Sequence, residues 1–134
     1  MNPFKKIITK ILAFEAHRVL NKFKPTIIGI TGSVGKSSTK EAVASVLESR
    51  HDVRRSQKSY NSEIGLALAT LGLSTAWQSP LGWIKNIIRG FRVYFVKKFP
   101  KIIVLEMGVD RPEDLDKLMG IAKPTVGIIT AIGE

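Results

Sequence analysis

The sequence predicts an α/β fold in which a P-loop-type, mostly parallel sheet is flanked by helices, with an amphipathic helix at the N-terminus. Three observations lead to this prediction. Apolar, β-branched runs alternate along the chain with segments of helical periodicity. These runs are nearly continuous in apolar residues, as in strands that are buried on both faces of a parallel sheet. A glycine-rich turn joins the first run to a helix, as in loops that bind phosphate.

Composition narrows the class of protein. The chain has 134 residues, 44% hydrophobic and 24% charged, which is the balance of one folded globular domain. It contains no cysteine, so disulfides and thiolate-bound metals are excluded. The two histidines, His17 and His51, stand far apart in the sequence and form no ligand cluster. Lys10 and Glu15 interrupt the apolar residues near the N-terminus, so no secretory signal is predicted and a cytoplasmic location is expected.

Residues 4–23 are predicted to form a basic amphipathic helix within an N-terminal unit of residues 1–24. Apolar side chains recur there at helical spacing: Phe4, Ile7, Ile8, Ile11, Leu12, Ala16, Val19, Leu20 and Phe23. Lysines and arginines lie off that stripe, and Pro25 ends the helix.

The predicted domain of residues 25–134 begins with a strand over about 26–31, followed by a helix that reaches about residue 49. The apolar face of this helix is predicted to comprise Ala42, Val43, Val46 and Leu47. A short strand near 53–56, a polar loop over 57–62 and a helix over 63–71 come next.

The second half of the chain repeats the alternation. Ser79-Pro80 is typical of a helix start, and the helix is predicted to reach about residue 98. One side of it carries Trp83, Ile84, Ile87, Ile88, Phe91, Tyr94 and Phe95. A buried strand is predicted over 101–106, a helix opening at Pro112, and a last strand over 124–130.

The turn after the first strand is the strongest functional signal. Main-chain N–H groups of such a turn, and of the helix N-terminus that follows, bind anionic oxygens. Lys36 is predicted to reach the terminal phosphates of a nucleotide, and Ser37 offers a hydroxyl to Mg²⁺. We therefore predict ATP and Mg²⁺ as ligands. The predicted cradle comprises Thr31, Gly32, Ser33, Val34, Gly35, Lys36, Ser37 and Ser38.

The plain alternative is an ordinary glycine turn with Lys36 in solvent. The common P-loop pattern places another glycine where this chain has Ile30, so the match is to a shorter form. The β-branched run before the turn and the helical pattern after it favour the phosphate loop.

Glu106 is the second candidate site residue, because it closes a predicted strand. Ligands collect at the carboxyl ends of strands in open α/β sheets, and Mg²⁺ prefers hard oxygen ligands. A solvated acid at the end of a strand is the alternative. Asn61, just before the helix over 63–71, is interpreted either as a helix cap or as a contact on the substrate side of the nucleotide site.

Four stretches in this order resemble the central ATP-binding domain of the Mur ligases, above all the branch that adds D-alanyl-D-alanine to the UDP-muramoyl tripeptide of peptidoglycan. They are Ile30-Thr-Gly-Ser-Val-Gly-Lys-Ser-Ser-Thr-Lys-Glu41, Tyr60-Asn-Ser-Glu-Ile-Gly65, Val104-Leu-Glu-Met-Gly108 and Ile128-Ile-Thr-Ala-Ile-Gly-Glu134. The resemblance implies an ATP-dependent ligase that converts a carboxylate to an acyl phosphate, which an amine then attacks. It implies that Lys36 acts on the β- and γ-phosphates, that Ser37 and Glu106 hold Mg²⁺, and that Asn61 faces the substrate.

The chain also departs from that family's pattern. The UDP-sugar-binding domain is replaced by the helix of residues 1–24, and residues 77–100 look like a helical insertion. The family's histidine after the Gly-Glu region, its carbamylated lysine and its C-terminal domain would lie beyond Glu134. We therefore expect residues 25–134 to be a partial ATP-binding domain that does not catalyse ligation alone.

Two other classes of function stay open. An unrelated P-loop NTPase or phosphotransferase is one, although Glu106 fits its usual aspartate poorly. The other is a basic module that binds a membrane surface, since residues 1–24 carry six basic residues against one acid and residues 81–101 carry six against none, within a net charge of +10. That would add peripheral contact with the inner face of the membrane. We favour the simpler interpretation that both stripes pack inside the protein, and rank nucleic-acid binding last.

Overall fold

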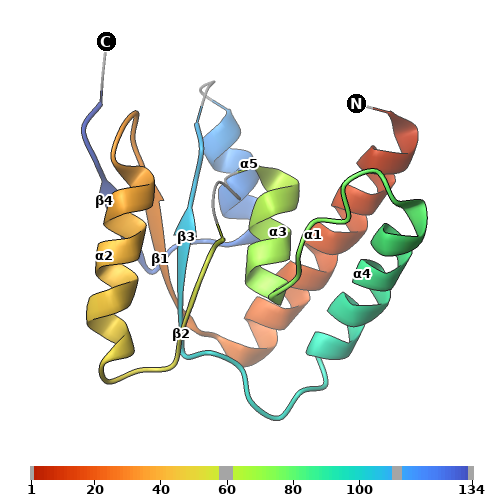
Figure 1. The fold of residues 1–134 in the computed structure, drawn as a ribbon, viewed down its shortest axis with the longest axis horizontal. Coiled ribbons are helices and arrows are strands. Elements are labelled where there is room, and N and C mark those ends of the chain that lie inside the picture. The colour runs from red at the N-terminus through yellow and green to blue at the C-terminus, as the bar shows by residue number, and fades with distance from the viewer. Residues whose placement is uncertain (1, 58–61, 110–112, 133–134) are drawn as a thin grey trace.

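The computed structural model describes residues 2–57, 62–109 and 113–132. Within them, a four-stranded, all-parallel sheet has the strand order β2-β3-β1-β4 (Figure 1). The strands are β1 (Thr26–Thr31), β2 (Val53–Arg55), β3 (Ile102–Glu106) and β4 (Val126–Ile129). Helices flank the sheet, so the predicted fold class is confirmed.

The described helices follow the predicted order. They are α1 (Pro3–Phe23), α2 (Lys36–Glu48), α3 (Glu63–Leu71), α4 (Pro80–Val93) and α5 (Asp114–Ile121). The main difference in bounds is that α4 ends at Val93, so Tyr94 and Phe95 lie beyond it rather than on it. Pro112, where α5 was predicted to open, lies outside the described residues.

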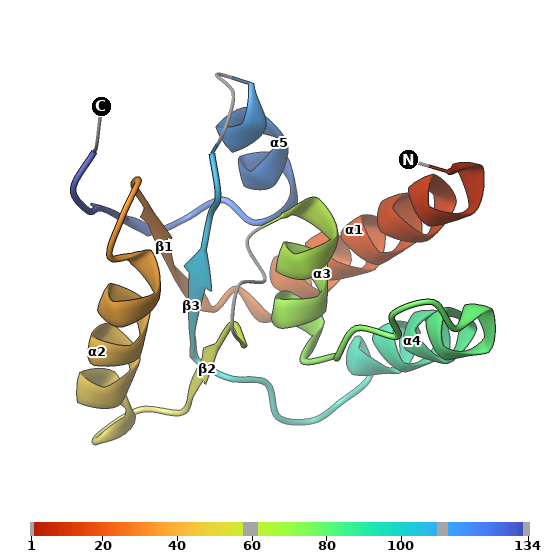
Figure 2. The same cartoon turned by 45° about the horizontal axis from the view of Figure 1, so that its top comes forward.

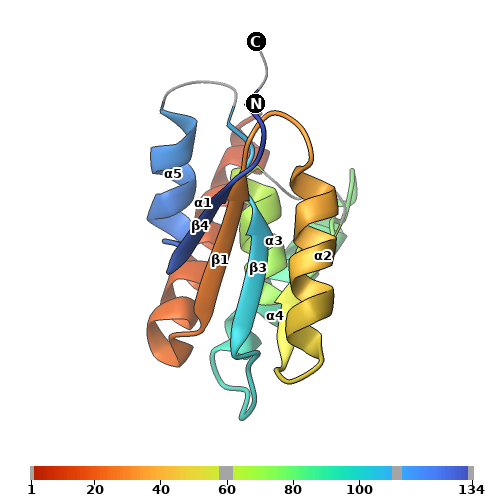
Figure 3. The same cartoon turned by 90° about the vertical axis from the view of Figure 1, so that its left-hand side faces the viewer.

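The two faces of the sheet are covered by different helices. On one face, Ile28, Ile30 and Val104 pack with Ala44 of α2. On the other face, Ile27, Ile103 and Leu105 join a larger core that includes α1 and α3. Successive residues of the central strands β1 and β3 alternate between these cores, which explains why the buried parts of both strands are apolar. Figures 1 and 3 show α2 on one side of the sheet and α5 on the other.

The predicted inner face of α2 was partly wrong. Ala44 is fully buried, whereas Val46 is 73% exposed. Val43 and Leu47 pack at the edge of the same core. Lys40, one turn before Ala44, is also buried. The face towards the sheet therefore runs through positions 40, 43, 44 and 47, and the opposite side carries Val46.

The apolar stripe of α1 packs inside the protein, as favoured from the sequence. Leu12, Ala16 and Val19 are buried against α3 and its neighbours. Asn2 caps the helix by accepting a hydrogen bond from the N–H of Lys5 at 2.7 Å. The buried face is narrower than predicted, however, because Phe4 and Ile7 are exposed.

Helix α4 lies beside α1, away from the sheet (Figure 2). The Ser79 side chain caps α4, as the Ser79-Pro80 pair predicted. Its hydroxyl oxygen accepts a hydrogen bond from the N–H of Gly82 at 3.1 Å. The stripe predicted on α4 is split by this packing: Trp83 is buried, whereas Ile88 and Phe91 are exposed. Among the described residues, no helix combines the length and the hydropathy needed to cross a bilayer.

Candidate nucleotide-binding site

The candidate site lies where β1 and β3 end side by side. Ile30 pairs with Glu106 in the parallel register, and the N–H of Met107 donates to the carbonyl of Ile30 at 2.8 Å. This pairing brings the turn after Thr31, the last residue of β1, next to the acid that closes β3. The carboxyl edge of a parallel sheet is where ligands bind in open α/β folds.

The turn between β1 and α2 requires glycine at two positions. Gly32 has φ 140°, and a Cβ there would lie 2.0 Å from the Thr130 hydroxyl oxygen. Gly35 has φ 84° and forms the N-cap of α2. Both backbone conformations are ones that L-residues with side chains rarely adopt. The local structure of the turn therefore follows directly from its glycines.

The segment after β4 holds the turn in place. The Thr130 hydroxyl donates to the carbonyl of Val34 at 2.7 Å. The N–H groups of Ser33 and Val34 donate to the carbonyl of Ala131, at 3.0 and 3.4 Å. Two of the amides predicted to cradle phosphate thus anchor the turn in this structure, a contact between distant parts of the chain that local sequence does not reveal.

Lys36 begins α2 and folds back over the turn. Its Nζ donates to the carbonyl of Gly32 at 2.7 Å. The N–H groups of Lys36, Ser37 and Ser38 belong to the first turn of α2, where backbone donors have no partner within a helix and favour anions. The ammonium group and these amides therefore form one electropositive end of the site.

Ser37 and Glu106 meet at the base of the turn. The Ser37 hydroxyl donates to Oε1 of Glu106 at 2.5 Å. Glu106 is 1% exposed, and its N–H donates to the hydroxyl oxygen of Ser56 at 3.4 Å. No group of three or more histidine, cysteine or acidic side chains forms a metal cluster in the described part of the chain. A hydroxyl and one carboxylate are hard oxygen donors, which fits Mg²⁺ completed by phosphates and water.

A cavity of about 450 Å³ adjoins the turn. Lys36 and Lys117 bring positive charge to its wall, and Glu63 and Asp114 bring negative charge. Its lining comprises Gly32, Ser33, Lys36, Ser62, Glu63, Gly108, Val109, Asp114, Lys117 and Leu118. Sequence reasoning missed the contribution of α5. The spacing of Asp114 and Lys117 on the helix that follows β3 was the available signal, because it places both on one helix face near the carboxyl edge.

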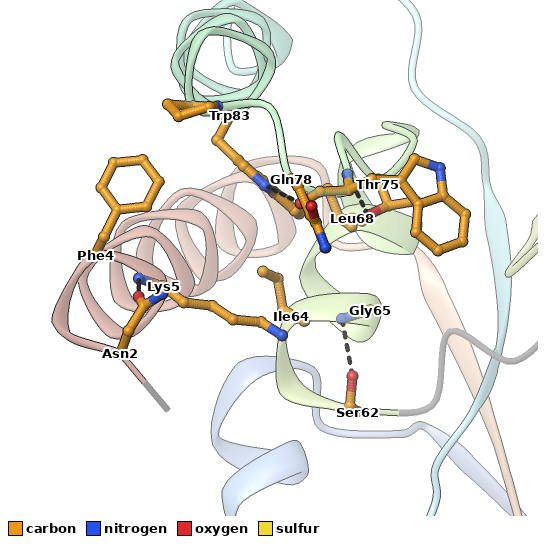
Figure 4. A pocket seen from close by; sticks show the side chains of 12 residues that line it. Asn2, Phe4, Lys5, Ser62, Ile64, Gly65, Leu68, Thr75, Gln78 and Trp83 are labelled. Atoms are coloured by element: carbon orange, nitrogen blue, oxygen red, sulfur yellow. Dashed lines mark hydrogen bonds between the residues drawn. The ribbon is translucent and has the colours of Figure 1, made fainter.

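A larger cavity of about 750 Å³ lies on the other side of the start of α3. Its walls come from the beginning of α1, the beginning of α3 and the segment 75–83, and Figure 4 shows the Lys5 side chain extending towards α3. Ser62 caps α3 through the N–H of Gly65 at 3.3 Å and lines both cavities. Asn61, predicted to face the substrate, lies outside the described residues.

Two curated relatives of this chain carry the same name. The UDP-N-acetylmuramoyl-tripeptide–D-alanyl-D-alanine ligase of Synechocystis is 33% identical over 112 residues, covering 84% of this chain and 20% of its own length. The protein of that name from Bacillus subtilis is 29% identical over 119 residues, covering 89% of this chain and 21% of its own length. The chain thus spans about a fifth of the length of these relatives. It matches no family model.

Solved structures agree with the sequence relatives. The crystal structure of the MurF ligase from Thermotoga maritima in complex with ADP matches with a TM-score of 0.66 and 29% identity, over 93% of this chain and 24% of that one. The chain is therefore related, in sequence and in fold, to one segment of the Mur ligase family.

Proposed function

We propose that this chain binds Mg·ATP at the β1–α2 turn and forms the phosphoryl-transfer part of an ATP-dependent carboxylate–amine ligase of peptidoglycan precursor synthesis. One observation carries the proposal: helix-terminal amides, the Lys36 ammonium group and the Ser37–Glu106 oxygen pair meet at one end of the sheet. The names of the curated relatives supply the substrates, UDP-muramoyl tripeptide and D-alanyl-D-alanine.

Each residue has a defined role in this proposal. Residues 31–38 hold the phosphates through their backbone, for which the N–H groups of Ser33 and Val34 exchange the Ala131 carbonyl for phosphate oxygens. Lys36 likewise exchanges the Gly32 carbonyl for the β- and γ-phosphates. Ser37 and Glu106 hold Mg²⁺, which neutralises phosphate charge when it is bound. The γ-phosphoryl group passes to a carboxylate oxygen, giving an acyl phosphate and ADP. An amine then attacks the carbonyl carbon, losing a proton, and inorganic phosphate leaves. The contribution of this domain is electrostatic stabilisation and positioning.

The cavity in Figure 4 is the proposed location of the rest of the carboxylate substrate. It shares Ser62 with the cavity beside the turn, so a molecule whose carboxyl reaches Lys36 extends into it past the start of α3. Lys5 offers this acidic substrate a positive charge. Asn61 is proposed to contact the substrate because it immediately precedes Ser62.

The proposed organisation follows the family resemblance. Residues 25–134 form part of the ATP-binding domain, residues 77–100 are an insertion in it, and residues 1–24 are an added helix. Ligation is proposed to require further parts beyond these. We propose that the chain acts in the cytoplasm, in peripheral contact with the inner face of the membrane.

Replacing the phosphate-binding ammonium group tests the proposal most directly. Lys36→Ala should weaken Mg·ATP binding by roughly 10- to 100-fold in calorimetry, since a hydrogen bond to a charged group contributes about 1.5–3 kcal/mol. Lys101→Ala is the matched control, because Lys101 immediately precedes β3 at the opposite end of the sheet. Wild-type affinity in Lys36→Ala would remove the phosphate-loop assignment.

The metal assignment needs a separate experiment. Glu106→Ala should weaken ATP binding strongly in Mg²⁺ and much less in EDTA, because the carboxylate acts through the ion. An equal loss in both buffers would count against a metal role. Thermal unfolding checks that the variant folds, since Glu106 is buried. The wild-type chain should form no amide from UDP-muramoyl tripeptide, D-alanyl-D-alanine and ATP, and robust turnover would contradict its proposed incompleteness.

A further inference from the structure

Helices α1 and α4 run side by side in the same direction (Figure 2). A groove of about 390 Å³ separates them. Ile11 and Phe14 line it from α1, and Ile88 and Phe91 line it from α4. Residues about halfway along α1 therefore lie across the groove from residues in the second half of α4.

The outer side of α4 carries a continuous apolar strip. Positions three and four apart lie on one face of a helix, and these positions hold large apolar side chains here. All five are exposed: Leu81 by 72%, Ile84 by 46%, Ile88 by 49%, Phe91 by 56% and Phe95, just beyond the helix, by 64%. The opposite side of α4 buries Trp83, Asn86 and Gly90. Neighbouring elements therefore pack against one side of α4 and leave its more apolar side exposed to solvent.

Helix α1 extends this strip across the groove. Ile7 and Phe14 are 57% and 62% exposed, and Ile11 lies between them at helical spacing. We call the combined surface the docking face. It comprises Ile7, Ile11, Phe14, Leu81, Ile84, Ile88, Phe91 and Phe95.

Basic side chains border the docking face on both sides. Lys6 and Lys10 come one position before Ile7 and Ile11, whereas Arg89 and Arg92 come one position after Ile88 and Phe91. One position turns an α-helix by about 100°, so in two parallel helices these opposite offsets place both basic sets at the outer margins. Lys85 adds to the margin on α4.

No acid offsets this charge on the two helices. Helix α4 contains none, and the single acid of α1, Glu15, is buried below the face. A Cβ at Gly90 would lie 2.8 Å from Oε1 of Glu15, which shows how closely α4 covers that carboxyl. Burial raises the pKa of Glu15 to about 7, so it carries little negative charge in slightly acidic solution.

We propose that the docking face binds the surface of a bilayer that contains anionic phospholipids, with α1 and α4 lying in the plane of the interface. This deepens the peripheral location in the proposed function by naming the surface that makes the contact. The apolar side chains enter the boundary between headgroups and acyl chains, and the basic margins contact lipid phosphates. Helix α4 forms an outer layer on the side of the protein opposite α2, so docking leaves the β1–α2 turn uncovered (Figure 1).

Charge and apolarity together favour a bilayer over other occupants. A nucleic acid would use the basic margins but leave the apolar strip between them without a partner. A second copy of this chain would cover the strip but bring positive margins against positive margins, which is repulsive. An anionic interface satisfies both features.

Vesicle flotation tests the proposal with the intact chain. We expect binding to vesicles of phosphatidylglycerol and phosphatidylcholine, and none to pure phosphatidylcholine. Ile88→Ser with Phe91→Ser should weaken binding roughly tenfold, because two apolar side chains no longer enter the interface. A variant with Lys85→Gln, Arg89→Gln and Arg92→Gln should lose roughly fivefold per charge. The charge-matched control, Arg50→Gln with Lys101→Gln and Lys123→Gln, changes exposed residues outside both helices and should bind nearly as wild type.

Several outcomes would overturn the proposal. Absence of wild-type binding to acidic vesicles would do so, as would equal losses in the two charge variants, which would indicate unspecific attraction. A dimer in sedimentation that the serine variant abolishes would assign the face to a second copy, and tighter retention on DNA than on vesicles would assign it to nucleic acid. Lys36→Ala should lose ATP binding but keep vesicle binding. The double variant Ile88→Ser with Phe91→Ser should keep ATP binding but bind vesicles more weakly. The nucleotide and membrane proposals therefore fail separately.

Discussion

Helices α1 and α4 are both basic and amphipathic, but their apolar faces have different surroundings in the structure. The apolar stripe of α1 packs into the main core, where Leu12 and Ala16 are fully buried. The apolar strip of α4 faces outward, and α4 is attached through its less apolar side. Amphipathicity therefore predicts that a stripe will be covered, but which other element or surface covers it depends on the tertiary arrangement.

The largest effect should come from truncating the buried stripe. Leu12→Ala should lower the free energy of unfolding by about 3 kcal/mol, because it removes a fully buried side chain and leaves a cavity between α1 and α3. Urea denaturation followed by circular dichroism measures this. A loss below about 1 kcal/mol would show that α1 is not part of the cooperative core.

The contact between the two helices can be tested through pH. The pKa of Glu15 rises from 4.5 to about 7 on folding, because burial against α4 disfavours the carboxylate. The folded state therefore holds its proton more tightly than the unfolded state, and stability falls as pH rises through this window. Between about pH 5 and pH 8, wild type should lose about 2 kcal/mol relative to Glu15→Gln. Parallel pH profiles for the two proteins would mean that α4 does not bury this carboxyl.

A smaller effect is expected on the inner side of α4. The buried Asn86 amide donates to the carbonyl of Ser74 at 2.9 Å, which ties α4 to the segment before it. Asn86→Ala should cost about 1 kcal/mol, since the carbonyl loses its partner. Hydrogen exchange should show faster opening of α4 in this variant while α1 keeps its protection. Equal acceleration in both helices would contradict the separate roles assigned to them.

The smallest effect on stability is expected for a leucine on the outer strip of α4, which is compared with the buried Leu12 of α1. Leu81→Ala on the outer strip should change the free energy of unfolding by less than about 0.5 kcal/mol, because Leu81 is 72% exposed. The same urea measurement as for Leu12→Ala gives a matched pair. A cost near that of Leu12→Ala would show that the outer strip is covered within the protein in solution.

Sequence patterns predicted most of the fold because the deciding signals are local. The apolar runs, the glycines at positions 32 and 35 and the cap at Ser79 were recognised from neighbouring residues. The N-cap of α3 is Ser62, one residue after Asn61, which the sequence offered as a cap. The end of α4 was placed too late because the apolar spacing continues through Phe95 although the helix stops at Val93. Periodicity alone does not reveal where a helix ends when no glycine or proline marks the position.

The candidate site was predictable only in its local part. The turn and Glu106 are contiguous motifs, so their residues were named from the sequence. The anchoring by Thr130 and Ala131, and the lining by Asp114 and Lys117, depend on strand order and on the path of α5. Those contacts join positions far apart in the chain, so local sequence does not reveal them. The spacing of Asp114 and Lys117 indicates that the two share a helix face, but not that this face lines the site.

The anchoring of the β1–α2 turn has a mechanical consequence. Because Ser33 and Val34 are tied to Ala131, a pull on the polypeptide that leaves β4 is transmitted to the glycine turn without passing through the core. Conversely, when those amides turn to bind an anion, their hydrogen bonds to Ala131 break and the segment after β4 loses this attachment. The β1–α2 turn and the segment after β4 are thus mechanically coupled, and binding at either one shifts the other.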